Sequence, residues 1–162
     1  MSFISVSGQK DLQVVPSVDI KRYAGTWYEI ARLPFYFESK LKCITATYTL
    51  RDDGKIDVLN RGHYIKEPGK VNSARGLAFV PDKNVPAKLK VQFFWPFRGD
   101  YWIIELDKDY GYVMIGEPSF KYLWILSRYK KLDPEILDKL LEKATDSGYD
   151  LSELIMTVHD CT

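Results

Sequence analysis

The sequence contains no apolar run long enough to cross a bilayer as a helix, which takes about 20 consecutive residues, because charged residues interrupt every hydrophobic stretch. An excess of charge of one sign is also missing, since 23 basic residues stand against 22 acidic ones. Nucleic-acid-binding surfaces require clustered positive charge. The balance therefore predicts no nucleic-acid partner.

Motifs typical of enzymes are missing as well. The chain has no Gly-x-Ser-x-Gly nucleophile elbow, no phosphate-binding loop, no His-Glu-x-x-His motif and no dinucleotide fingerprint. Its two histidines, His63 and His159, have no cysteine or carboxylate at the spacing of metal ligands. We therefore predict a protein that is not an enzyme, with no catalytic residue, no metal site and no cofactor.

Cysteine is scarce. Cys43 and Cys161 are the two cysteines, and their spacing matches no zinc site and no Cys-x-x-Cys redox motif. From the residues alone, two unrelated buried thiols and a long-range disulfide are both open alternatives.

Residues 1–8 lack the basic region, the long apolar stretch and the small-residue cleavage site of a secretory signal. Two readings follow from this: a cytosolic protein, or a mature domain whose export signal was removed.

Aromatic residues are abundant, at 14% with 11 Tyr and 4 Trp, and this favours strands. Between Ile44 and Leu50, apolar residues alternate with threonines in the period of two of a half-buried strand, and Asp52-Asp53-Gly54 is typical of a hairpin turn. With the turns that follow, the pattern predicts eight strands at residues 25–32, 44–50, 56–64, 71–80, 88–95, 100–106, 112–116 and 121–128. Eight meandering strands predict an all-β fold, an antiparallel up-and-down β-barrel with no exposed edge.

Two helical segments are expected beside these strands. Asp19 is a good N-cap for one turn ending at Tyr23. A longer helix should begin at Pro134 after the N-cap Asp133 and end at Gly148. Its apolar stripe should pack outside the barrel, on the outward residues Trp102, Ile104, Val113 and Ile115. We expect residues 1–17 to be an N-terminal lead-in and residues 18–162 to be a single domain.

The alternation also predicts which side chains point into the barrel. A completely filled barrel would have fewer glycines, alanines and tyrosines at such positions, so the pattern favours a cavity over a packed core. Apolar walls with a few polar groups suit a ligand that has a hydrocarbon tail and a polar head. The predicted ligand-binding residues are Ala46, Tyr48, Asn60, Gly62, Gly76, Ala78, Val91, Phe93, Trp95, Tyr101, Ile103, Glu105, Tyr112, Met114, Tyr122 and Trp124. The face of Glu29, in the first strand, depends on whether a bulge intervenes.

Two segments carry a family resemblance: Gly25-Thr26-Trp27, which opens the first strand, and Tyr122 to Arg128, which closes the last. An arginine lying on a buried indole stabilises it by a cation–π contact. This pairing resembles the signature of the lipocalins, and the likeness runs from about Val14 to Asp160. Residues 19–23, 46–54 and 89–91 look like the bacterial outer-membrane lipoprotein lipocalins, and Asp107 stands where many lipocalins have Thr-Asp-Tyr.

The resemblance implies a non-covalent carrier of a fatty acid or lysophospholipid, with a role in envelope lipid storage, transport or repair. It also implies a disulfide between Cys43 and Cys161, because apolipoprotein D-like lipocalins have cysteines at both equivalent places. A disulfide would indicate an oxidising compartment, and hence the periplasm, the outer membrane or secretion. Bacterial members are usually anchored by a lipidated N-terminal cysteine, and no cysteine precedes Cys43 here.

Alternatives follow from the same resemblance. One lipocalin branch uses a strand thiol as a nucleophile, which would give Cys43 that role, and plant relatives are associated with haem, which would make His63 a haem or tetrapyrrole ligand. The aromatic and cationic groups of Trp95, Phe97 and Arg98 predict a peripheral membrane contact at the open end. The sequence is compatible with either a monomer or a homodimer.

Overall fold

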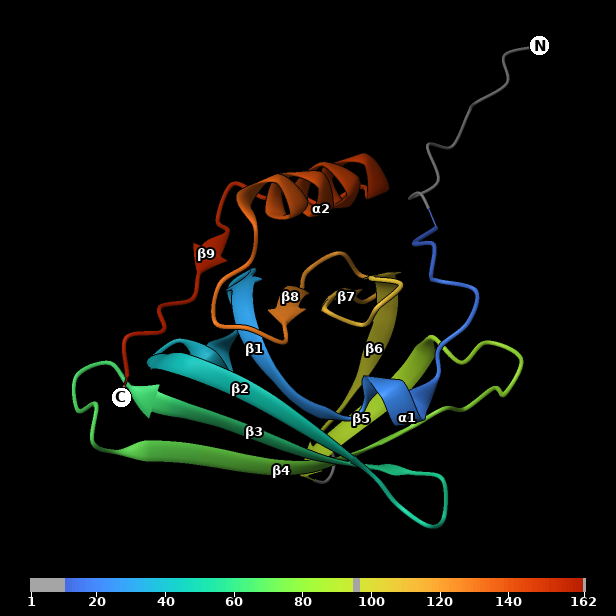
Figure 1. The fold of residues 1–162 in the computed structure, drawn as a ribbon, viewed down its shortest axis with the longest axis horizontal. Coiled ribbons are helices and arrows are strands. Elements are labelled where there is room, and N and C mark those ends of the chain that lie inside the picture. The colour runs from blue at the N-terminus through green and yellow to red at the C-terminus, as the bar shows by residue number, and fades with distance from the viewer. Residues whose placement is uncertain (1–10, 95–96, 162) are drawn as a thin grey trace.

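The computed structural model describes residues 11–94 and 97–161, and these form a closed eight-stranded antiparallel barrel with one long helix and one additional short strand (Figure 1). The barrel strands are β1 (Gly25–Arg32), β2 (Leu41–Leu50), β3 (Ile56–Tyr64), β4 (Val71–Phe79), β5 (Lys88–Phe94), β6 (Phe97–Leu106), β7 (Tyr112–Gly116) and β8 (Leu123–Ser127). β1 pairs with both β8 and β2, which closes the ring and confirms the predicted barrel. The short strand β9 (Ile155–Met156) adds to the end of β1.

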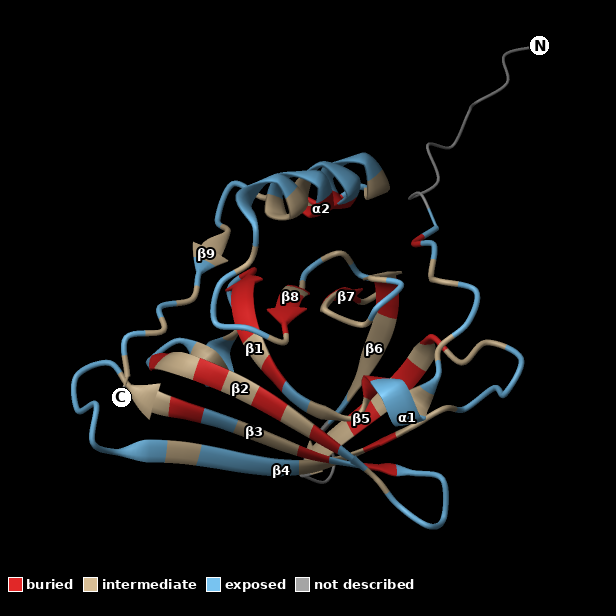
Figure 2. Cartoon of the chain, viewed as in Figure 1, coloured by how far each residue is buried: buried red, intermediate tan, exposed pale blue. Residues whose placement is uncertain are grey.

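The strands follow the alternation read from the sequence. Along β2, Ile44, Ala46 and Tyr48 are buried while the threonines between them are more exposed (Figure 2). The turn after β2 contains Gly54 with φ of +85°, a left-handed conformation that glycine adopts without steric cost. Each barrel strand pairs with its neighbour in the chain, as expected for an up-and-down barrel.

The helices begin and end at the expected residues. In α1 (Ile20–Tyr23), the Asp19 side chain accepts hydrogen bonds from the backbone N–H groups of Lys21 and Arg22. The longer helix α2 (Pro134–Ser147) has Asp133 as its N-cap and Gly148 in the left-handed conformation at its end. A third, short 3-10 helix, η1 (Tyr36–Glu38), lies between β1 and β2. Within the described residues, no helix is long and apolar enough to span a membrane.

Helix α2 packs on the outside of the barrel, over β7 and β8 (Figure 1). Its buried residues Leu140 and Ala144 share a hydrophobic cluster with Ile104, Met114 and Ile125. The prediction that Val113 and Ile115 face this helix is wrong, because both pack in the cluster inside the barrel. Strand β7 is apolar on both faces, so its alternation carried no information about which face is inside.

The segment before α1 contacts the barrel as well. Leu12 is buried in the cluster beneath α2, and the backbone N–H of Val15 donates to the carbonyl oxygen of Ile103 at 3.0 Å. Residues 11–15 are therefore packed against β6.

Candidate ligand cavity

One end of the barrel is closed by Trp27 and Arg128. The guanidinium of Arg128 lies 3.7 Å from the centre of the Trp27 ring, whose side chain is fully buried. Arg128 also donates hydrogen bonds to the carbonyl oxygens of Arg22, Tyr23 and Ala24, which ties α1 across the opening. The contact expected from the sequence is thus present, and it closes the barrel at the α1 end.

Two other signature residues support this closure. Gly25 has φ of +109°, and a Cβ atom there would lie 3.1 Å from the Arg128 Nη1 atom, so a larger residue would strain the backbone and crowd the guanidinium. Asp107 accepts a hydrogen bond from the backbone N–H of Gly111 at 3.0 Å and shapes the turn between β6 and β7.

Above this floor lies a cavity of about 330 Å³ inside the barrel. This volume is within the range of small-molecule sites. Its apolar wall comprises Phe35, Ile44, Ala46, Val58, Val91, Phe93, Ile115, Trp124 and Leu126. Its polar lining comprises Glu29, Glu38, Tyr48, Asn60, Arg98, Asp100, Tyr101, Glu117 and Tyr122. An apolar wall with polar groups can bury a hydrocarbon chain and orient a polar head.

A second cavity of about 380 Å³ adjoins the first, since Phe35, Glu38, Ile44, Asn60 and Phe93 line both. It extends along the first half of β4, past Asn72 to Arg75. In the described part of the chain, β4 pairs with β5 only from Leu77 to Phe79. The second cavity therefore lies beside the part of β4 that has no described pairing with β5, next to the first cavity.

Three tyrosine hydroxyls are linked at the bottom of the first cavity. Tyr101 donates a hydrogen bond to Tyr48 at 2.9 Å and also hydrogen-bonds to Tyr23. Burial raises the pKa of all three phenols above the ordinary value of 10.0. The three side chains are therefore neutral across the physiological range, and they supply hydroxyl groups without charge.

A buried ionic cluster lies at the other end of the cavity, and only one of its members was considered from the sequence. Glu29 and Arg32 have side chains that are 2% and 4% exposed, and Arg32 Nη1 donates to Glu29 Oε2 at 3.0 Å. Thr157 donates to the same carboxylate oxygen at 2.5 Å. Residues three apart in a regular strand point to opposite faces, but a register shift between Glu29 and Ala31 brings both side chains to one side.

Glu38 of η1 joins this cluster. Its Oε2 atom is 3.4 Å from Arg32 Nε, and its carbonyl oxygen accepts a hydrogen bond from Arg32 Nη2. Burial raises the pKa of the Glu38 carboxyl well above 4.5, and the nearby Glu29 raises it further, against the opposing effects of Arg32 and Trp124. Within the described residues, the buried Oε2 atom has no hydrogen-bond partner.

Comparisons with known proteins agree with this architecture. A family model described as a lipocalin-like domain matches residues 18–159. The chain is a lipocalin. It is 43% identical over 146 residues to the outer membrane lipoprotein Blc of Escherichia coli K12, covering 90% of this chain and 82% of that protein. It is also 43% identical over 158 residues to temperature-induced lipocalin-1 of Arabidopsis thaliana, covering 92% of this chain and 83% of that protein.

A solved structure gives the same result for the fold. Insecticyanin of the tobacco hornworm Manduca sexta superposes with a TM-score of 0.72 at 26% identity, covering 91% of this chain and 84% of that chain. Lipocalins bind hydrophobic ligands inside the barrel, and this chain shares that general architecture. Membership places the chain among binding and transport proteins.

The structure brings half of the predicted ligand-binding residues of this lipocalin together around the first cavity. These are Ala46, Tyr48, Asn60, Val91, Phe93, Tyr101, Tyr122 and Trp124. Trp95 lies outside the described residues. The predicted set missed the other lining residues, among them Phe35, Glu38 and Ile44, of which Phe35 and Glu38 come from the connection between β1 and β2. Ile44 could have been found, because it shares the alternation of Ala46 and Tyr48.

Four residues of the predicted lining lie on the inner side of the barrel but do not line the cavity, namely Gly62, Gly76, Ala78 and Ile103. Ala78 and Ile103 are buried in the packed cluster around Trp27. A Cβ atom on Gly76 would lie 2.8 Å from the Phe93 ring, and one on Gly62 would lie 3.1 Å from the Leu41 side chain. The space beside both glycines is thus filled by neighbouring side chains, and the expectation that it stays open for ligand is wrong.

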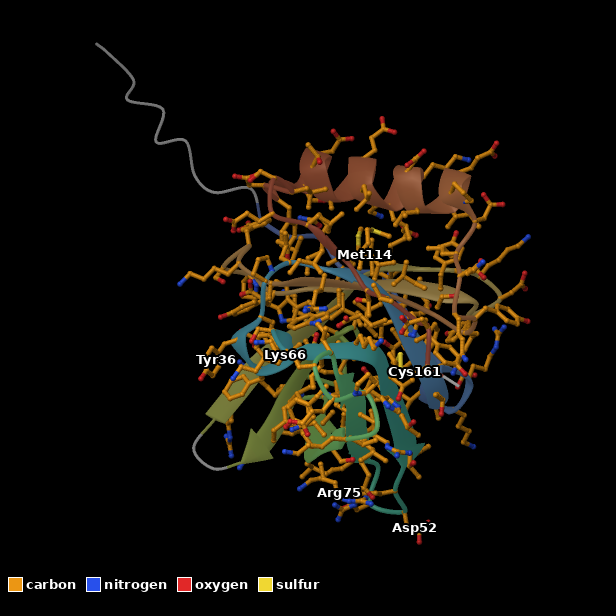
Figure 3. All side chains as sticks on the ribbon, turned by 90° about the vertical axis from the view of Figure 1, so that its left-hand side faces the viewer. Tyr36, Asp52, Lys66, Arg75, Met114 and Cys161 are labelled. Atoms are coloured by element: carbon orange, nitrogen blue, oxygen red, sulfur yellow. A yellow bond between two sulfur atoms is a disulfide. The ribbon has the colours of Figure 1, made fainter. Side chains whose placement is uncertain are left out.

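Glu105, Tyr112 and Met114 lie on the outside of the barrel, so their assignment to the lining is wrong. A register shift follows Ile103, because Ile103 pairs with Ile115 whereas Glu105 pairs with Met114. Glu105 consequently forms an ion pair with Lys143 of α2. Met114 lies between the barrel and α2 (Figure 3), and Tyr112 packs in the same outer cluster.

The predicted disulfide is confirmed, since Cys43 and Cys161 are bonded at a sequence separation of 118. It joins the C-terminal segment to β2, beside the hydrogen bond from Cys43 N to the carbonyl oxygen of Val158. A disulfide indicates an oxidising compartment outside the cytoplasm. Bonded in this way, Cys43 has no thiol to act as a nucleophile. His63 lines neither cavity, and its Nδ1 atom is 2.8 Å from the carbonyl oxygen of Pro68.

Proposed function

We propose that this lipocalin binds and carries one amphipathic lipid, a fatty acid or a lysophospholipid, with its acyl chain inside the barrel. The observation that carries the proposal is the cavity itself, which combines an apolar wall with polar groups at both ends. Burying about ten methylenes at ~0.8 kcal/mol each contributes roughly 8 kcal/mol before ordering costs, so this contribution alone sets an upper limit of about micromolar affinity, to which the polar contacts add.

A fluorescence titration tests this proposal. Trp124 lines the cavity, so its emission should change when laurate or a lysophospholipid enters. Ala46→Phe places a ring in the cavity and should lower the affinity at least about tenfold, equivalent to 1.4 kcal/mol. Thr49→Phe is the matched control, since Thr49 is an exposed residue on the opposite face of β2. Equal affinity for both variants would mean that the lipid does not bind inside the barrel.

The physiological role we propose is lipid storage, transport or repair in the cell envelope. The disulfide supports an extracytoplasmic location, and the E. coli relative, outer membrane lipoprotein Blc, is by its name a protein of the outer membrane. We propose the periplasm, the outer membrane or secretion for this chain. Fractionation of the native cells, with immunodetection of the oxidised protein, tests this, and recovery in the cytoplasm would contradict it.

We also propose a peripheral membrane contact at the open end. Tyr36 is 84% exposed there and Phe37 is 50% exposed, and aromatic side chains favour the membrane–water interface. Of the residues that suggested this contact in the sequence, Arg98 is exposed, whereas Trp95 and the side chain of Phe97 lie outside the described part. Vesicle co-sedimentation should be weakened by Tyr36→Ser and left unchanged by Tyr129→Ser, a change at another exposed tyrosine.

A further inference from the structure

We infer that the mouth of the cavity is a recognition site for an ammonium head group, formed by the rings of Phe35, Tyr122 and Trp124 and the carboxyl group of Glu38. We call these four residues the aromatic–carboxylate site. The inference rests on the proposed function, because it assumes that a single-chain lipid enters the barrel. It goes further by naming the charge that the head group of this lipid carries.

The three rings form a compact cluster. The Phe35 ring lies 5.3 Å from Tyr122 and 5.4 Å from Trp124, edge to face in both cases, and Tyr122 stacks on Trp124 at 6.0 Å. All three line the cavity and are only partly buried. The face of an aromatic ring attracts a cation within about 6 Å of its centre, and clusters of such rings bind quaternary ammonium groups. The rings of Phe35, Tyr122 and Trp124 can therefore form cation–π contacts with a quaternary ammonium group.

The described lining of the cavity contains more carboxyl groups than guanidinium groups. Among the described residues that line it, four carry carboxyl groups, namely Glu29, Glu38, Asp100 and Glu117, and one carries a guanidinium, Arg98. The charges of Glu29 and Asp100 are offset by Arg32 and Lys90, which leaves Glu38 and Glu117 as the carboxyl groups that a positively charged head could approach. A positively charged head would be attracted by the same groups.

Three of the four carboxyl groups already have strong partners. Glu29 is paired with Arg32 and Thr157, and Asp100 is 2.5 Å from Lys90 Nζ. Glu117 accepts hydrogen bonds from the backbone N–H groups of Ser119, Lys121 and Tyr122.

Glu38 differs from these three carboxyl groups. Its Oε2 atom is 3.4 Å from Arg32 Nε but accepts no hydrogen bond within the described residues. The Glu38 side chain is 13% exposed and lines both cavities. The carboxyl group also interacts with Arg32, Glu29 and Trp124, so a bound ammonium would add a positive charge beside the Oε2 atom, which accepts no hydrogen bond.

The chain of the ligand fits the same orientation. Tyr48 and Val58 line the cavity and pair with each other, and Tyr48 also pairs with Gly25 at the start of β1, so they lie toward the closed end. Phe35 and Glu38 come from the connection between β1 and β2, at the opposite end. A head group at the aromatic–carboxylate site thus directs its chain toward the closed end.

Binding of a cation should also release a proton. The carboxyl of Glu38 faces Glu29 and Arg32 of β1, Tyr48 of β2 and Trp124 of β8, and it shares the second cavity with Arg61 and Arg75. Burial raises its pKa, whereas a cation beside it favours the ionised form. The affinity for an ammonium ligand should therefore rise with pH, while the affinity for an uncharged ligand of equal chain length should not.

The experiment compares three ligands with the same chain: dodecyltrimethylammonium, 1-dodecanol and laurate. Each is titrated into the protein by calorimetry below its micellar concentration. At pH 7.5 we expect the ammonium ligand to bind about tenfold more tightly than laurate, equivalent to 1.4 kcal/mol. Glu38→Gln should weaken the ammonium ligand about fivefold and leave dodecanol unchanged. Glu67→Gln, which removes an exposed carboxylate from the turn between β3 and β4, is the control and should change neither.

A second variant keeps the inference testable if Glu38→Gln does not fold. Phe35→Leu retains an apolar side chain but removes one ring, so it should weaken the ammonium ligand and spare dodecanol. Laurate binding as tightly as the ammonium ligand, or variants with unchanged affinity for that ligand, would overturn the ammonium site while leaving the carrier function intact. If none of the three ligands binds, the proposed carrier function itself is wrong.

Discussion

The guanidinium of Arg128 lies 3.7 Å from the centre of the Trp27 ring and hydrogen-bonds to three consecutive carbonyl oxygens, those of Arg22, Tyr23 and Ala24. One side chain at the end of β8 thus connects the first strand, the α1 segment and the closed end of the barrel. Trp27 and Arg128 are about a hundred positions apart in the chain. Their contact therefore links the end of the last barrel strand, β8, to the first barrel strand, β1.

Replacing Arg128 with alanine should lower the free energy of unfolding by about 1–3 kcal/mol, since it removes the cation–π contact and leaves carbonyl groups without donors. Arg128→Lys keeps the charge but loses the planar fork of donors, so it should restore only part of the loss. Urea denaturation of the three proteins provides the comparison. An unchanged midpoint for Arg128→Ala would contradict the stabilising role of this contact.

Tyr101→Phe should destabilise the barrel by about 1–3 kcal/mol, because it removes hydrogen bonds to the buried hydroxyls of Tyr23 and Tyr48. Tyr36→Phe is the control, since the Tyr36 side chain is 84% exposed and its hydroxyl remains in water. Thermal unfolding followed by circular dichroism should separate the two variants. A Tyr101→Phe protein as stable as the control would show that this hydroxyl network contributes nothing to stability.

Reduction of the Cys43–Cys161 bond should destabilise the protein by about 4–5 kcal/mol in the chain-entropy model, because the bond closes a loop of 118 residues. Thermal unfolding with and without reductant measures this loss. Alkylation of the denatured protein without reductant, read by mass spectrometry, should label no cysteine. Two labelled thiols would contradict the bond.

The stability of the protein should depend on pH through Glu38. Its pKa in the folded state is raised above 4.5 by burial and by Glu29, so the folded state holds this proton more tightly than the unfolded state. Its contribution to stability is therefore complete below the unfolded pKa and is lost as the pH rises through the folded pKa. Glu38→Gln cannot lose a proton, so it should gain stability relative to the parent as the pH rises above 4.5.

Denaturation at several pH values checks this difference, with Glu67→Gln as the control. Because the Glu67 side chain is exposed, its substitution should leave the pH profile parallel to that of the parent. A constant difference between Glu38→Gln and the parent at all pH values would show that the Glu38 proton is not linked to folding.

Much of this fold could be predicted from local pattern. The alternation between Ile44 and Leu50, the turn at Gly54 and the caps at Asp133 and Gly148 are decided by residues close together in the chain. The Trp27–Arg128 contact could also be predicted, because both segments resemble a lipocalin signature. Each of these features depends either on residues close together in the chain or on two segments whose sequences resemble a known family.

Only the tertiary structure decided which groups face the cavity. One bulge after Ile103 places Glu105 outside, where it meets Lys143, and another after Glu29 turns Arg32 toward the carboxylate of Glu29. A single extra residue inverts every later position of a strand, and whether one is inserted depends on ring closure and on what packs against each face. Alternation specifies that a strand has two faces, whereas neighbouring elements determine which face is the interior.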